Sequence, residues 1–120
     1  MIVKEQTHAG EFMVSEANGS RSREQITIAY SKDLPPGTVL GKVNETGKYR
    51  QLDPAATDGS ETPGGVLYDW SDASAGDRKA VAIVRDAEVV RASLAFADGM
   101  SQDDKNAALD ALAERGVVSR

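Results

Sequence analysis

The sequence predicts a small α+β domain, mostly short β-strands and loops with one C-terminal helix. Three observations support this fold class. The chain has 120 residues, the length of one ordinary domain. Apolar and polar residues alternate over short segments that are separated by Gly, Pro and Asn, a pattern typical of half-buried strands and turns. A clear helical period of apolar residues begins only near residue 101.

The first half of the chain is predicted to hold an arm and several short strands. Residues 1–11 have no sustained apolar period, so we expect a flexible N-terminal arm, followed by a single domain over residues 12–120. Phe12 and Val14 alternate with polar neighbours, as do Ile26, Ile28 and Tyr30. The polar stretch between these two strands contains Asn-Gly, which indicates a turn or hairpin loop that would make them a strand pair.

Turn residues divide the middle of the chain. Prolines and a glycine make residues 33–38 a rigid connector. Residues 39–43 are predicted to form a strand, and residues 49–52 its antiparallel return after a turn around Gly47. Residues 53–64 are predicted to be an exposed loop, and residues 65–68 another apolar strand.

The last third of the chain contains the predicted core strand and the helix. Residues 79–85 carry alternating β-branched residues and alanines, which favours a central strand. Of the weaker apolar segments at residues 88–91 and 93–96, at least one is expected in a strand. Ser101 followed by Asp104 predicts a helix N-terminus, and Gly116 predicts its end. Val117 and Val118 then form a short strand or a packed tail.

Composition excludes several classes of function. The formal net charge of −5 disfavours nucleic acid as a partner. Cysteine is absent and His8, on the predicted arm, is the single histidine, so thiolate chemistry, Cys/His zinc sites and a catalytic triad are not expected. The longest apolar run has five residues, and no secretory leader is evident, so we expect no membrane partner and an intracellular product. We therefore predict no catalytic residues, no cofactor and no metal.

Two sets of charged residues are candidates for ion binding, but an exposed, solvated role is favoured for each. Asp69, Asp72 and Asp77 could converge on a hard cation, but their spacing fits no known metal-binding loop and favours a solvated acidic loop. Arg21 and Arg23 form a compact basic pair, for which a solubilising role is favoured over anion binding.

The order of motifs after residue 33 resembles the head decoration protein family of lambda-like tailed phages. The resemblance covers roughly Phe12 to the C-terminus, including the final helix. It is carried by LPPGTVLGK at residues 34–42, GKY at 47–49, DPAATDG at 53–59, GVLY at 65–68, VAIV at 81–84 and RDAEV at 85–89.

This resemblance implies a non-enzymatic capsid protein. The resemblance also implies a β-clip-like core and a homotrimer that binds and stabilises the outer surface of the expanded head. The implied location is therefore the virion, after synthesis in the host cytoplasm. In the family an N-terminal arm pairs edge to edge with the major capsid protein. The corresponding positions in this chain are Ile2, Val3, Lys4, Glu5, Gln6 and Thr7.

Some alternatives stay open from the sequence. Tyr68 and Trp70 are large apolar groups beside a loop, and they could lie in a trimer interface or pack inside the subunit. The turn over Leu34 to Leu40 also resembles β-clip domains of the antifreeze-like kind, which implies a small-molecule module that binds sugar acids. A metal-dependent enzyme that uses the three aspartates named above is the least favoured reading.

Overall fold

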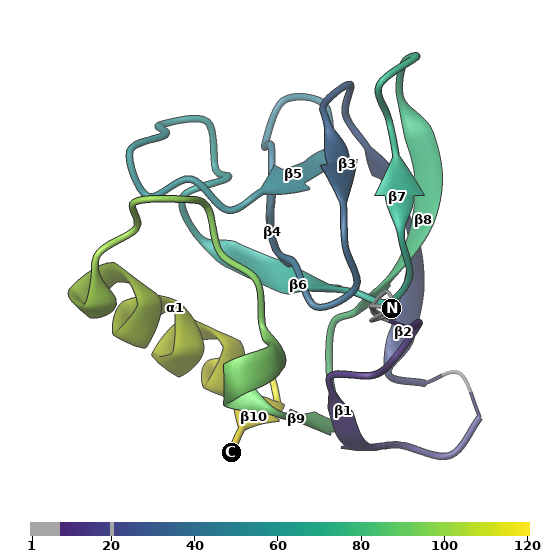
Figure 1. Cartoon of the computed structure of the whole chain (residues 1–120), viewed down its shortest axis with the longest axis vertical. Helices are drawn as coiled ribbons and strands as arrows, with labels where there is room; N and C mark the ends of the chain where they lie inside the picture. The colour runs from purple at the N-terminus through teal and green to yellow at the C-terminus, as the bar shows by residue number, and fades with distance from the viewer. Residues whose placement is uncertain (1–7, 20) are drawn as a thin grey trace, which may run out of the picture.

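The structure is a computed structural model that describes residues 8–19 and 21–120. Ten short strands, one 3-10 turn and one α-helix make up the described part of the chain, and Figure 1 shows the helix along one side of the strands. The elements are β1 (Met13–Glu16), β2 (Arg23–Ile28), β3 (Asp33–Leu34), β4 (Val39–Lys42), β5 (Tyr49–Gln51), β6 (Pro63–Leu67), β7 (Ser71–Asp72), β8 (Arg78–Ile83), β9 (Ala87–Val89), η1 (Arg91–Ser93), α1 (Gln102–Glu114) and β10 (Val117–Ser119).

Five strands form a closed barrel in the order β2-β5-β4-β6-β8. Strands β2 and β8 pair antiparallel over six residues each, without a register shift. Strands β2 and β5 meet in parallel at one residue pair, Ile28 with Tyr49. The barrel is therefore closed at the end of β2, while the first half of that strand lies apart from β5.

Two smaller sheets complete the fold. In one of them β9 lies between β1, which is antiparallel to it, and β10, which is parallel to it. The other is the two-stranded ribbon of β3 and β7. Figure 1 shows the three-stranded sheet at the end of α1 and the ribbon at the opposite side of the barrel.

Alternating side chains on the barrel strands fill two apolar clusters. On β8, Ile83 belongs to a cluster shared with α1 and the three-stranded sheet, whereas Ala82 belongs to a second cluster with Ile28 and Tyr49. Strands β4 and β6 divide their side chains in the same way. Neighbouring residues of a strand point to opposite faces, so one strand can serve both clusters.

The helix follows the sequence prediction closely. The Ser101 side chain accepts a hydrogen bond from the Asp104 N–H at 3.1 Å, and α1 ends two residues before Gly116. Ala108, Leu109 and Leu112 are the buried residues of the helix. This helix is too short and too polar to cross a membrane, and the same holds for the helical structure in all the described residues.

The predicted hairpin β4-turn-β5 and the predicted central strand β8 are confirmed. The close packing of the loop after β5 depends on Gly41, where a Cβ atom would lie 2.2 Å from the Ser60 carbonyl oxygen. Ser60 is fully buried, and Pro63 and Gly64 are buried as the first residues of β6, so the predicted exposed loop over residues 53–64 is wrong at these three positions.

The predicted pairing of the first two strands is wrong. Strand β1 pairs with β9, and β2 pairs with β8, so the polar segment between them crosses from one sheet to another. A register shift between Met13 and Ser15 interrupts β1, and Val14 is 52% exposed. Ile26 and Ile28 are buried as expected, but Tyr30 lies beyond the end of β2 and is exposed.

Candidate functional site

The described chain begins with a tight turn that is docked on Tyr68. The Gly10 N–H donates to the Tyr68 carbonyl oxygen at 2.9 Å, and the Met13 N–H donates to the Gly10 carbonyl oxygen at 2.9 Å. Gly10 has φ of +69°, and a Cβ atom there would lie 3.0 Å from the Tyr68 ring. Glycine suits both the backbone conformation and the close approach. The turn thus fixes the point at which the N-terminal segment leaves the domain, and we call it the arm root.

The Tyr68 side chain is held in place by an arginine that is itself part of an ion pair. The Arg23 guanidinium donates to both carboxylate oxygens of Glu16, at 3.1 and 2.7 Å, and to the Tyr68 hydroxyl oxygen at 3.2 Å. Its carbon atom lies 4.1 Å from the centre of the Tyr68 ring. Planar stacking and a bidentate carboxylate contact are both properties of arginine that lysine lacks. We call Glu16, Arg23 and Tyr68 the clamp.

The clamp is ionic at neutral pH. Hydrogen bonding to Arg23 and the charge of its guanidinium lower the pKa of Glu16 below its usual value. The pKa of Arg23 is raised, first by its hydrogen bond to Glu16. The Arg23 and Glu16 side chains are 34% and 24% exposed, so water screens their attraction only in part. Protonation of Glu16 in acid would weaken the clamp.

A shallow hollow of about 300 Å³ separates the arm root from β1. Its walls include the exposed Val14 and the partly buried Met13. Backbone, apolar and charged groups meet in this hollow. Such a surface can hold a peptide segment against the domain. The lining residues are Ala9, Gly10, Met13, Val14, Ser15, Glu16, Arg23 and Tyr68.

The structure separates the residues that the sequence analysis grouped. Tyr68 is half-buried and belongs to the clamp, whereas Trp70 is 46% exposed beyond the end of β6. The six arm positions Ile2, Val3, Lys4, Glu5, Gln6 and Thr7 lie outside the described residues.

The three aspartates do not converge. The Asp72 carboxylate accepts hydrogen bonds from the Ser74 hydroxyl and N–H, which lower its pKa to about 2. Asp77 pairs with Lys48 and accepts from the Tyr30 N–H at 2.9 Å. Among residues 8–19 and 21–120, there is no group of three or more His, Asp or Glu side chains arranged to hold a metal ion. Metal-dependent chemistry at this loop has no support in the described geometry.

Sequence reasoning missed Gly10, Glu16 and Arg23 as a functional group. Arg23 was predicted to be solubilising, but its ion pair and its stacking on Tyr68 give it a structural role. Arg21, its neighbour in the basic pair, is mostly exposed and lies 3.4 Å from Asp86. The alternation of β2 did carry a signal, because it places Arg23 on the opposite face from the buried Ile26 and Ile28.

A family model described as "Bacteriophage lambda head decoration protein D" matches residues 2–117. The match covers nearly the whole chain, including the arm positions and the clamp. No curated protein matches the chain significantly.

Proposed function

Given that the chain belongs to the family of bacteriophage lambda head decoration protein D, we propose that it binds the outer surface of the expanded phage head as a homotrimer and stabilises it. A decoration role on the phage capsid follows from the family, which is structural rather than enzymatic. The orientation, the oligomeric state and the preference for the expanded head belong to this proposal. The proposal also includes a β-clip-like core. It further includes synthesis in the host cytoplasm, before the protein joins the virion.

The observation that carries the proposal is that the family match starts at residue 2 and continues through the domain. The positions from Ile2 to Thr7 thus belong to the part of the chain that resembles the family. The arm root then supplies a fixed point from which these residues can extend. We propose that the arm adds as a strand to the major capsid protein, which gains backbone hydrogen bonds without a strict side-chain code.

Weak arms are sufficient if three act together. Once one arm of a trimer is bound, the other two search a small volume, so their effective concentration is high and the combined binding is durable. Binding that favours the expanded shell over other states shifts the population toward the expanded shell by the difference in affinity. Stabilisation of the head therefore requires neither catalysis nor a cofactor.

The subunit contact is a separate part of the proposal. Trp70 is large, apolar and 46% exposed, and Val81, on β8, is 36% exposed. Tyr68 is part of the clamp and also bonds to the arm root, so its burial in a trimer would connect the subunit contact to the arm. Trp70 is the single tryptophan, so its fluorescence reports this contact directly. We expect a blue-shifted emission in the trimer and a red shift when the trimer is diluted to monomers.

Removal of residues 1–7 tests the arm. This cut leaves Gly10 and the clamp in place, so the truncated chain should keep its fold and its oligomeric state. We expect it to bind expanded heads at least about tenfold more weakly, because each trimer loses three linked contacts. Sedimentation with purified heads measures the binding, and light scattering measures the oligomeric state. Full binding by the truncated chain would remove the arm from the mechanism, and failure of the intact chain to bind heads would refute the proposed function.

A further inference from the structure

Strand β2 has one edge that the described chain leaves without a partner along most of its length. The Val84 N–H donates to the Ser22 carbonyl oxygen at 2.9 Å, in the same ladder that pairs β2 with β8. Antiparallel ladders alternate between residue pairs that exchange backbone hydrogen bonds and pairs that do not. Glu24 and Ile26 therefore bond to β8, and the backbone groups of Gln25 point the other way.

An independent hydrogen bond supports this alternation. The Val81 carbonyl oxygen, on the residue that pairs with Gln25, accepts from the Tyr68 N–H at 2.9 Å and so faces the β6 side of β8. On the free side, β2 meets β5 only at Ile28, and the next N–H, that of Ala29, donates to the Tyr49 carbonyl oxygen. In the described chain, no backbone or side-chain hydrogen bond reaches the Gln25 backbone from this side.

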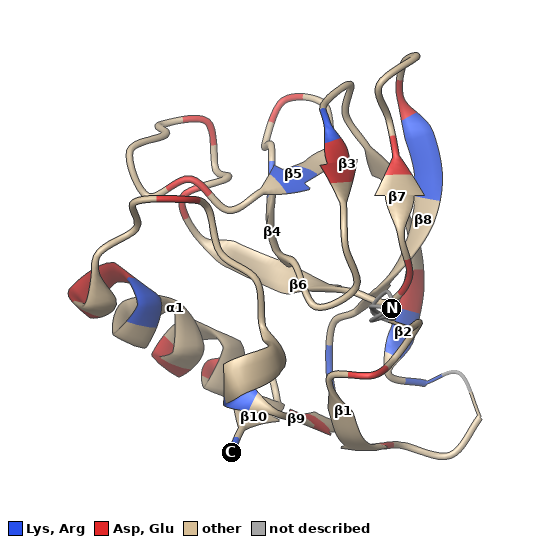
Figure 2. Cartoon of the chain, in the orientation of Figure 1, with Lys and Arg blue, Asp and Glu red and all other residues tan. Residues whose placement is uncertain are grey.

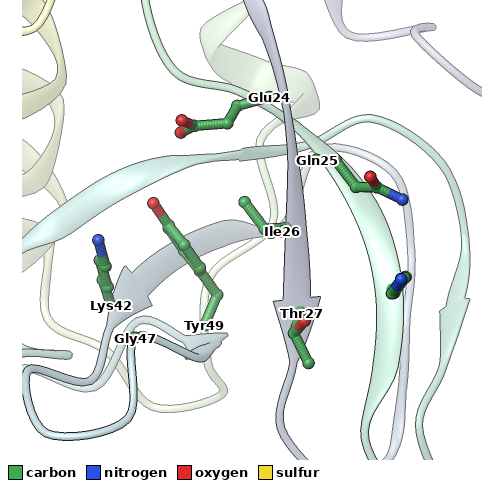
Figure 3. Close-up of a pocket in the computed structure, with 8 residues that line it drawn as sticks. Glu24, Gln25, Ile26, Thr27, Lys42, Gly47 and Tyr49 are labelled. Carbon is green, nitrogen blue, oxygen red and sulfur yellow. The ribbon is translucent and has the colours of Figure 1, made fainter.

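The free edge opens onto a recess of about 310 Å³. Figure 3 shows β2 at one side of this recess, with the Tyr49 ring and the Lys42 ammonium across from it. The Glu24 carboxylate extends into the same space. Side-chain groups of both positive and negative charge surround the edge, so a segment that enters the recess must present polar side chains there.

The backbone of β2 has no irregularity that blocks the addition of another strand. Natural proteins protect exposed edges with prolines, bulges, charged side chains or very short strands. Of the two charged residues of β2, Arg23 is held by Glu16, and Glu24 is the one that a partner segment must accommodate. Strand β2 has six residues, no proline and an unbroken register with β8. By contrast, β1, which is also at the edge of a sheet, carries a register shift. An edge that is both regular and open is suited to binding.

We propose that the free edge of β2 binds an extended segment of the same capsid shell that the arm engages. This inference rests on the proposed function. We assign this partner because the free edge and the clamp are neighbouring surfaces. Arg23 is both the first residue of β2 and the centre of the clamp. Arg23 donates to the Tyr68 hydroxyl oxygen, and the Tyr68 carbonyl oxygen holds Gly10, so a shell segment that meets the arm root can reach the start of the free edge across the clamp. Polar side chains at alternate positions of that segment would face Glu24 and Lys42.

Amide hydrogen exchange tests the inference without any substitution. In the free trimer, the N–H groups of Gln25 and Thr27 should exchange rapidly, whereas those of Glu24 and Ile26 should already be protected by β8. On expanded heads, we expect exchange at Gln25 and Thr27 to slow by at least about tenfold. Protection of Gln25 in the free trimer would show that another copy of the chain covers the edge, and it would overturn the proposal. Unchanged rapid exchange on the heads would do the same.

A substitution pair supplies a second test. Gln25→Pro removes the outward N–H and leaves the bonds to β8 in place, since proline is tolerated at strand edges. Gln25→Val removes the same side chain but keeps the N–H. We expect Gln25→Pro to bind heads about tenfold more weakly and Gln25→Val to bind like the intact chain. Equal binding by both variants overturns the inference alone, whereas no binding by the intact chain overturns the proposed function with it. If Gln25→Pro does not fold, the exchange measurement decides.

Discussion

Replacement of Glu16 by Gln should loosen the clamp while it preserves the shape of the side chain. The substitution removes one partner of a bidentate ion pair with N–O distances of 3.1 and 2.7 Å. Exposed ion pairs contribute about 0.2–1 kcal/mol, and hydrogen bonds to charged groups about 1.5–3 kcal/mol. The two side chains are 34% and 24% exposed, so an intermediate loss of about 1 kcal/mol in unfolding free energy is expected.

The dependence of this loss on pH gives the sharper test. The pKa of Glu16 is lowered in the folded protein from a usual value of 4.5. A lowered pKa means that the carboxylate stabilises the fold fully above about pH 4.5 and that this stability is lost as the pH falls through the folded pKa. The difference between the intact chain and Glu16→Gln should therefore be constant near neutrality and shrink in acid.

Thermal or urea unfolding at several pH values measures this difference. Protein concentration must be fixed, because association changes the apparent stability. Glu88→Gln is the matched control, since Glu88 forms a similar bidentate pair with Arg120 at a more exposed site. We expect the control to lose less stability. Equal stability of Glu16→Gln and the intact chain at neutral pH, or a difference that grows in acid, would refute the role of the clamp.

Three further substitutions, one of them with an exposed control, test the packing and the helix cap. Gly41→Ala should destabilise the fold severely, by more than about 3 kcal/mol, because its Cβ would meet the Ser60 carbonyl oxygen at 2.2 Å; a melting temperature close to that of the intact chain would contradict this. Leu112→Ala should cost about 2–5 kcal/mol in urea unfolding because Leu112 is 1% exposed, whereas Val118→Ala at a 40% exposed site should cost far less. Ser101→Ala should cost about 1 kcal/mol through loss of the helix cap, and unchanged stability in calorimetry would count against that cap.

Local signals in the sequence predicted local structure well. The alternation around Ile83 marked the central strand, and the spacing of Ser101 and Asp104 marked the start of the helix, because both signals depend on residues within a few positions of each other. The turn around Gly47 likewise joined two strands that are adjacent in the chain.

Long-range pairing could not be predicted in the same way. Alternation around Phe12 indicated a strand, but it does not say which strand lies beside it, and β1 pairs with a segment more than seventy residues away. The clamp had the same difficulty, because Arg23 meets Tyr68 only after the barrel has closed. Gly10 carried no signal on its own, since its close approach to the Tyr68 ring depends on that same closure.

The two apolar clusters share β8, and this sharing has a mechanical consequence. Ile83 is packed on one side of the strand, and its immediate neighbours Ala82 and Val84 are packed on the other. A force applied to the helix reaches β8 through the first cluster, and β8 passes it to the second cluster because adjacent residues of one strand belong to both. The two clusters should therefore unfold together under load rather than one after the other.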